Sequence, residues 1–145
     1  MTSAADLVAA FADKSRRNAA IVALVGAINA GDLRRVRVCD EAKAALIAGL
    51  EHPNAKVRWW CLQLMDHLAD ESYLEPILRK LSDPVAKVRR HAIHALTCAP
   101  CKPTRARLAV QIEDALRGAL ADTDARVRED ARRALDSLGA GEAAR

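Results

Sequence analysis

Apolar residues recur at helical spacing in three segments of the chain that align with one another without gaps. Each segment opens with Ala-[Lys/Arg]-Val-Arg, and its valine is Val57, Val88 or Val127. A small residue follows each valine by four positions and an apolar residue by eight, so these side chains share one face of a helix. The three faces comprise Val57, Cys61, Leu64, Met65 and Leu68; Val88, Ala92, Ala95, Leu96 and Ala99; and Val127, Ala131, Ala134, Leu135 and Leu138. We therefore expect three amphipathic helices that bury equivalent stripes.

A second amphipathic stretch precedes each of these segments, over residues 41–50, 72–81 and 107–120. The linkers between the paired stretches contain residues that favour turns, namely His52-Pro53-Asn54, Ser82-Asp83-Pro84 and Asp122-Thr123-Asp124. Helix hairpins that recur in this way predict an all-α protein, an α-solenoid of stacked antiparallel helix pairs.

This order of elements resembles the HEAT repeat, in which a first helix and a turn with Asp, Asn or Pro are followed by a second helix that opens with Val-Arg. The closest likeness is to the HEAT-like repeats of phycobilisome lyases, and it covers about residues 40–139. It implies a single domain with repeats at residues 40–70, 71–102 and 103–139 and a tail at residues 140–145. We expect residues 1–39 to form a degenerate N-terminal helical unit.

The degenerate unit is expected to contain a first helix over residues 5–12 and a second helix after it. The motif Lys14-Ser15-Arg16-Arg17 resembles Lys87-Val88-Arg89-Arg90, with a serine in place of the valine. This alignment puts four residues at core positions: Ala19, Val22, Ala23 and Gly26. Ile21, Leu24, Val25 and Ile28 make the second helix apolar nearly all round, which predicts burial on more than one side. Its neighbour would be the segment of residues 31–39, which carries the basic run Arg34, Arg35 and Arg37, or another subunit.

Three arginines, Arg58, Arg89 and Arg128, directly follow the repeat valines. They could form a basic stripe for a partner. Alternatively, they form a structural ladder, in which each arginine bonds the carboxylate or carbonyls of an interhelical turn such as that of Asp83 or Asp122. Recurrence at one position beside the core resembles the structural arginine of the HEAT pattern and favours the ladder.

The opposite side of the second helices lines the concave surface in HEAT arrays, and here its residues differ between repeats. A variable surface on a repeating scaffold is where binding specificity is expected. The candidate partner-binding residues are Trp59, Trp60, Gln63, His67, Arg90, His91, His94, Asp130 and Arg133, and Asp66 is expected on the same surface. Because adjacent helical positions diverge by about 100°, we expect only one tryptophan to point fully into the groove and the other to pack between repeats.

A second candidate chemistry comes from His91, His94, Cys98 and Cys101, which follow one another at helical spacing. The candidate metal ligands are His94, Cys98 and Cys101, because His and Cys are the ligands that zinc prefers. His91 lies about two turns from Cys98, too far to share the ion. The fourth ligand would be water, His67 or another chain. The alternative interpretation is that both cysteines only cap the helix and shape the long turn to Thr104.

Composition excludes several other classes of protein. Of the 145 residues, 51% are hydrophobic but only 3% are aromatic, which disfavours a β-sandwich, and 29% are charged. No basic leader with an apolar core opens the sequence, and the longest apolar stretch, residues 19–30, is shorter than the roughly 20 residues that span a bilayer. We therefore expect a cytoplasmic protein with reduced cysteines, among which Cys61 serves as a small core residue.

The sequence thus favours a non-catalytic scaffold that binds a protein or peptide through its concave face. It shows no Gly-rich phosphate loop and no recognisable Ser-His-Asp trio, and no cofactor is expected apart from the zinc alternative. The formal charge of +4 permits a nucleic-acid partner, as in HEAT-like DNA glycosylases, but acidic residues offset the arginines of the expected groove. A bilin-lyase-like role is a further alternative, which is suggested only by the likeness of the repeats to those of phycobilisome lyases.

Overall fold

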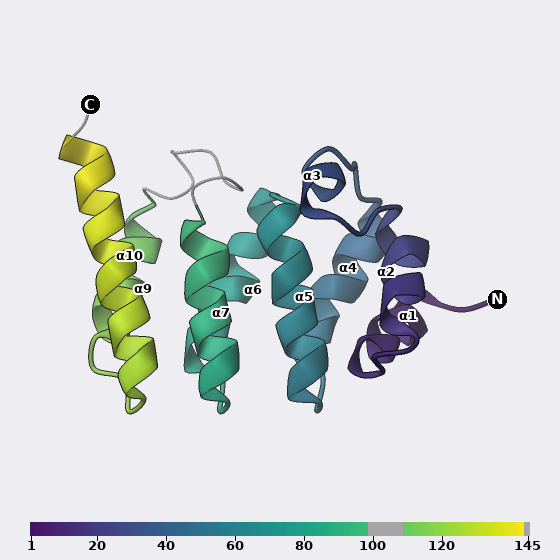
Figure 1. The fold of residues 1–145 in the computed structure, drawn as a ribbon, viewed down its shortest axis with the longest axis horizontal. Helices are drawn as coiled ribbons and strands as arrows, with labels where there is room; N and C mark the ends of the chain where they lie inside the picture. Colours follow the sequence, from purple (N-terminus) through teal and green to yellow (C-terminus); the bar gives the residue numbers. More distant parts are fainter. Residues whose placement is uncertain (99–108, 144–145) are drawn as a thin grey trace.

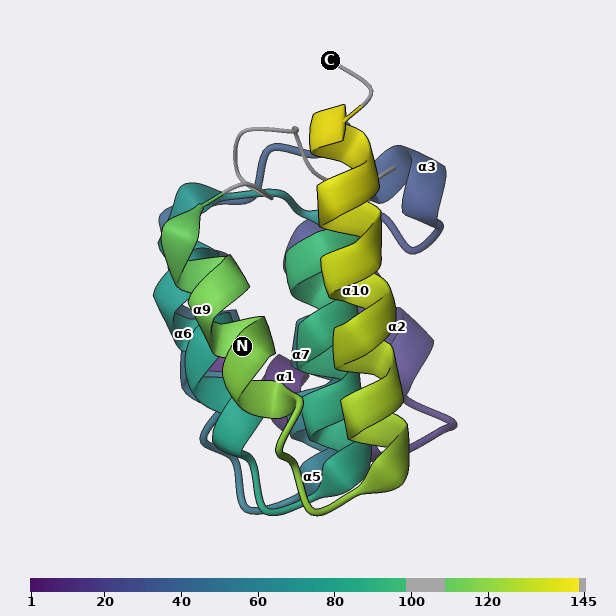
Figure 2. The ribbon, with the colours of Figure 1, turned by 90° about the vertical axis from the view of Figure 1, so that its left-hand side faces the viewer.

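The computed structural model shows an array of helix pairs that stack side by side (Figure 1). It describes residues 1–98 and 109–143, with side chains up to residue 139. The pairs are α4 (Asp40–Gly49) with α5 (Ala55–His67), α6 (Leu74–Arg79) with α7 (Ala86–Thr97), and α9 (Val110–Ala119) with α10 (Ala125–Ala143). Helices α5, α7 and α10 form one layer, and α4, α6 and α9 form the other (Figure 2). The all-helical solenoid predicted from the sequence is confirmed.

Shorter elements complete this array. At the N-terminus, α1 (Ala4–Ala9) runs into the 3-10 turn η1 (Ala10–Ala12), followed by α2 (Arg17–Val25) and α3 (Ala30–Leu33). Two further 3-10 turns, η2 (Glu71–Tyr73) and η3 (Lys80–Ser82), flank α6. The predicted helix start at Arg107 and the expected cap Thr104 lie outside the described residues.

The predicted apolar stripes form the core. Val57, Cys61, Ala92 and Val127 have no exposed surface, and burial raises the pKa of the Cys61 thiol, as expected for an inert core cysteine. Ala99 lies outside the described residues, and Leu135 is only partly buried. Leu62 and Ile93, outside the predicted stripes, are buried as well. The reason is that α7 packs against α5 on one side and α10 on the other, so the flanks of an inner helix are covered too.

The recurring arginines form the predicted structural ladder. Arg58 donates to the backbone carbonyls of His52 and Pro53 in its own turn, at 2.8 and 3.0 Å, and to both carboxylate oxygens of Asp83 in the next turn. Arg89 repeats this pattern with the Asp83 carbonyl and the Asp122 carboxylate, at 2.8 Å for each bond. Hydrogen bonding to Arg89 lowers the pKa of Asp122 and raises that of Arg89. Each inner arginine therefore ties two successive turns together.

The N-terminal segment follows the same rule in a register shifted by one residue from the prediction. Arg17 donates to the Phe11 carbonyl, six residues earlier, at 2.6 Å, which is the spacing of the Arg58–His52 and Arg89–Asp83 bonds. Arg17, and not Arg16, therefore stands at the ladder position. Asp13 accepts from the Ser15 amide in a turn, so α2 begins only at Arg17.

This shift corrects the predicted core of the N-terminal segment. The expected core positions Ala19, Val22 and Ala23 are exposed, and Gly26 is the left-handed C-cap of α2 with φ 83°. The buried residues of α2 are Ala20, Ile21 and Val25. The expectation that α2 is buried on more than one side is also wrong, because Val22 and the following Ile28 remain exposed.

Among the described glycines, Gly49 has the least room for a side chain. A Cβ at this position would lie 2.5 Å from Cys61 Sγ and 2.7 Å from Val8 Cγ1, and both neighbours are buried. Neither neighbour is a flexible, exposed chain that can move aside. The absence of a side chain at residue 49 is therefore required by the packing of α4 against α5 and α1.

We expect Gly49→Ala to lower the free energy of unfolding by about 1–3 kcal/mol, the usual cost of overpacking a core. The measurement is urea denaturation followed by circular dichroism. Gly118→Ala is the matched control, because Gly118 is also helical and a Cβ there meets nothing within 4 Å. It should gain up to about 1 kcal/mol from helix propensity. Equal changes for the two variants would contradict the close-approach argument.

Candidate functional site

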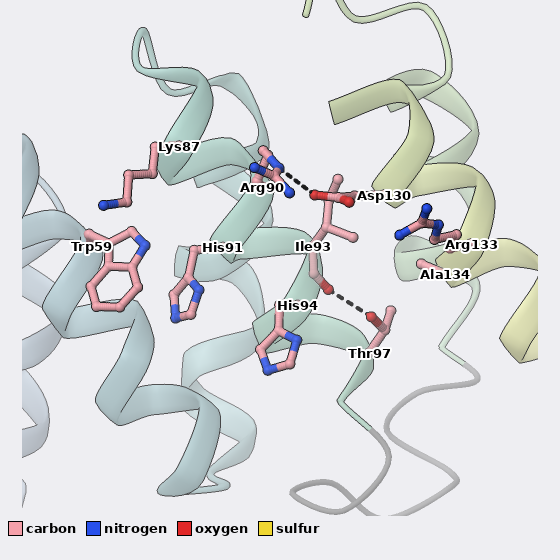
Figure 3. Close-up of a pocket in the computed structure, with 10 residues that line it drawn as sticks. All are labelled: Trp59, Lys87, Arg90, His91, Ile93, His94, Thr97, Asp130, Arg133 and Ala134. Atoms are coloured by element: carbon pink, nitrogen blue, oxygen red, sulfur yellow. Dashed lines mark hydrogen bonds and ion pairs between the residues drawn. The ribbon is translucent and has the colours of Figure 1, made fainter. Parts of the chain in front are cut away.

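An open pocket of about 500 Å³ lies on the surface of the α5, α7 and α10 layer (Figure 3). Helix α7 contributes most of its lining, with α5 on one side and α10 on the other. The residues that line it are Trp59, Lys87, Arg90, His91, Ile93, His94, Thr97, Asp130, Arg133 and Ala134. We call this site the α7 pocket.

A row of stacked rings forms one side of the α7 pocket. The Trp59 ring stacks on His91 with centroids 4.4 Å apart and planes at 28°, and His91 stacks on His94 at 5.6 Å and 22°. Lys87 Nζ lies 5.4 Å from the centre of the Trp59 ring. His91 and His94 are three residues apart and so share one face of α7, while Trp59 reaches them from α5. The row offers flat π surfaces beside a cation.

Basic side chains dominate the charge of the pocket. Lys87, Arg90 and Arg133 face a single carboxylate among the lining residues, that of Asp130. Arg90 Nε donates to Asp130 at 2.6 Å, and this hydrogen bond raises the pKa of Arg90. Arg133 Nε donates to Glu129 at 3.1 Å, one turn earlier on α10, but its side chain stays 75% exposed. Both arginines thus have a carboxylate partner, and Lys87 adds a third positive charge beside Trp59.

The structure brings together six of the nine residues that the sequence suggested for partner binding: Trp59, Arg90, His91, His94, Asp130 and Arg133. The other three do not line the α7 pocket. Gln63 Nε2 lies 3.2 Å from His67 Nε2 one turn along α5. Trp60 meets Trp59 edge-on at 5.1 Å and lies under the Arg17 guanidinium at 4.5 Å. It thus packs toward the N-terminal segment, in agreement with the expectation that only one tryptophan points into the groove.

Four lining residues were not among the candidates: Lys87, Ile93, Thr97 and Ala134. Lys87 belongs to the Ala-Lys-Val-Arg motif and Ala134 to a predicted core stripe, so their recurrence marked them as scaffold. Ile93 is buried and forms part of the pocket wall. Lys87 contributes to the pocket because it lies beside Trp59 of the neighbouring helix α5. The spacing of residues within one repeat does not indicate a contact between two helices.

Asp66 was expected on the concave surface, but it does not lie on the open surface. Its side chain is only 1% exposed, and its Oδ2 lies 3.1 Å from His94 Nε2 of the neighbouring helix. The ligand atoms of Asp66, His94 and Cys98 all lie within 4.8 Å of one another. His94 and Cys98, two of the three candidate metal ligands, are thus brought together, while Cys101 lies outside the described residues.

Comparison with known proteins identifies the repeat. A family model of HEAT repeats matches residues 44–135, more than half of the chain, from α4 into α10. No curated protein matches the chain. Across residues 1–98 and 109–143, every helix is too short or too polar to cross a membrane.

Proposed function

The chain belongs to the HEAT-repeat family, and we propose that its α7 pocket binds an acidic segment of a protein partner. HEAT repeats generally serve as protein-interaction scaffolds and are typically non-catalytic. The observation that carries the proposal is the row of rings formed by Trp59, His91 and His94 beside three cationic side chains. Phycobilisome-lyase-type repeats are a finer likeness on which this proposal does not depend.

Charge supports an acidic partner. Asp66 is one of the acidic residues expected to offset the arginines of this surface, but its carboxylate is buried. Within the pocket lining, Asp130 is the one carboxylate beside Lys87, Arg90 and Arg133, and Glu129 next to the lining pairs with Arg133. Carboxylates of a bound segment would approach Lys87 and Arg133, and complementary charge of this kind mainly raises the rate and specificity of association.

The rings supply the apolar part of the interaction. Trp59 is partly buried against the core and stacks on His91, and these contacts restrict its orientation before a partner arrives. A preorganised aromatic ring loses little conformational freedom on binding, and Trp is enriched at the residues that dominate binding energy. We therefore expect the bound segment to place an apolar or aromatic side chain against Trp59 and acidic side chains beside it.

Selection from a random linear peptide library on the immobilised protein tests this function. We expect acidic peptides with an aromatic or large apolar residue to be enriched. A synthetic peptide of that kind should bind at least about 30-fold more weakly to Trp59→Ala, as is typical of a dominant interface residue. Arg133→Glu should also weaken binding, and it is safe for folding because this side chain is exposed.

Arg117→Glu provides the matched control. Arg117 lies on α9 in the other layer, is 63% exposed and pairs with Glu113 one turn away, as Arg133 pairs with Glu129. Its reversal should leave peptide affinity unchanged. If the enriched peptide binds wild type, Trp59→Ala and Arg133→Glu equally, the pocket is not the site. If an oligonucleotide binds with a steep salt dependence and displaces the peptide, the partner is nucleic acid and the proposal is wrong.

A further inference from the structure

Three chemically different side chains meet at the junction of α5 and α7. Asp66 comes from the last turn of α5, His94 from α7, and Cys98 is the residue that caps α7. Their ligand atoms, a carboxylate oxygen, an imidazole nitrogen and the Sγ atom, lie within 4.8 Å of one another. Asp66 is buried, Cys98 is half-buried and His94 is 55% exposed.

The local structure explains why these groups converge. His94 and Cys98 are four residues apart, and the Cys98 amide still donates to the His94 carbonyl at 2.9 Å. Both side chains therefore point to the same side of α7. Helices α5 and α7 run side by side in one layer (Figure 1), and the equivalent of Asp66 in the α7 repeat is Thr97. The end of α5 thus lies level with the end of α7.

We infer that Asp66, His94 and Cys98 form a binding site for a zinc-class divalent transition metal that joins the first two repeats. This inference goes beyond the proposed peptide site and does not depend on it. Mixed oxygen, nitrogen and sulfur donors suit zinc and its cobalt substitute, whereas calcium and magnesium prefer oxygen ligands throughout. The carboxylate and a thiolate together balance the charge of a divalent ion.

The distances are compatible with tetrahedral coordination. Bonds of about 2.0–2.3 Å place neighbouring ligand atoms about 3.3–3.6 Å apart. The 3.1 Å between Asp66 Oδ2 and His94 Nε2 is already close to this value, and Cys98 Sγ lies within 4.8 Å of both of these atoms. In the metal-free protein, the carboxylate and imidazole interact as an ion pair or hydrogen bond, and metal binding releases to solvent both the proton that they share and the Cys98 thiol proton. Three protein ligands leave a fourth position for water.

The next junction in the array provides an internal comparison. The residues that correspond to Asp66, His94 and Cys98 between α7 and α10 are Thr97, Arg133 and Ser137. That set lacks a carboxylate, an imidazole and a thiol, although the helices pack in the same way. The repeat therefore does not require these three residue types for stacking, and their convergence at one junction calls for a separate reason.

Titration of the purified, chelator-treated full chain with Zn²⁺ and Co²⁺ tests this inference. We expect one equivalent of Zn²⁺ to bind by calorimetry and Co²⁺ to give the intense charge-transfer absorption of a cobalt–thiolate bond. Asp66→Asn, His94→Ala and Cys98→Ser should each weaken binding at least about tenfold, the minimum expected for groups that hold a metal. Cys98→Ser should also abolish the charge-transfer band.

Cys39→Ser is the matched control, because Cys39 is an exposed cysteine at the start of α4. It should leave both the affinity and the cobalt spectrum unchanged. His94→Ala keeps the test decisive if Asp66→Asn fails to fold, since His94 is half-exposed and circular dichroism can verify that its variant is folded. The inference is overturned if the wild type binds neither metal, or if affinity survives His94→Ala and Cys98→Ser in folded protein.

Discussion

Arg58→Ala is expected to lower the free energy of unfolding by about 3–5 kcal/mol, the usual cost of removing one partner from a buried ion pair. The Arg58 side chain is 9% exposed and that of Asp83 is 1% exposed. The guanidinium donates to both Asp83 oxygens, at 2.8 and 3.0 Å, and to two backbone carbonyls. Its removal leaves the Asp83 carboxylate buried beside the Val85 amide but without its guanidinium. Urea denaturation followed by circular dichroism gives the measurement.

Arg128→Ala separates the ion pair from the carbonyl bonds. Arg128 donates to the Asp122 carbonyl at 2.7 Å, as Arg58 does to that of His52, but the Asp122 carboxylate is held by Arg89. We expect this variant to lose only about 1 kcal/mol, the net value of an ordinary hydrogen bond. The double variant Arg58→Met, Asp83→Leu should recover part of the loss, because no buried charge is left unpaired. Equal losses for Arg58→Ala and Arg128→Ala would show that the carboxylate contributes nothing.

Repetition made the fold predictable from the sequence. The same pattern occurs three times in register: a valine, an arginine directly after it and a small residue four positions after the valine. Because three copies agree, one atypical residue does not change the alignment of the repeats. The N-terminal segment departs from this pattern, so its register cannot be read from the other repeats. The alignment that places Ser15 at the valine position is out of register by one residue. Arg17 nevertheless donates to the carbonyl of the residue six positions earlier, which is the bond that defines the ladder position.

The candidate sites were less predictable because they lie between repeats. A helical wheel gives the direction of a side chain on its own helix. It does not show how far a neighbouring helix covers that side chain. Asp66 was expected on the open surface of α5 and is nevertheless buried, with its carboxylate 3.1 Å from His94 of the neighbouring helix α7. Lys87 likewise contributes to the α7 pocket only through its position over Trp59 of another repeat. Contacts across helices decide both cases.

Phe11→Ala is expected to lower the free energy of unfolding by about 3–5 kcal/mol, as other truncations of large buried aromatic residues do. Phe11 is completely buried in η1, which packs against both α2 and α5. Loss of this side chain opens a cavity at the interface between the N-terminal segment and helix α5 of the first repeat. The backbone carbonyl of residue 11, which accepts from Arg17, is kept in the variant. Phe11→Leu, which fills most of the space, should lose about 1 kcal/mol.

The form of this transition tests how the N-terminal segment is coupled to the array. In repeat proteins, stability is approximately a sum of unit and interface terms, so a weakened end can unfold separately. Trp60 lies 4.5 Å from the Arg17 guanidinium, so its fluorescence reports on that end when it is recorded in a Trp59→Phe background, whereas circular dichroism reports on all helices. If residues 1–39 act as an integral end unit, both signals of Phe11→Ala shift together to lower urea. An early fluorescence change with an unshifted dichroism midpoint would instead show that this segment is an appendage, because the repeats would then remain folded without it.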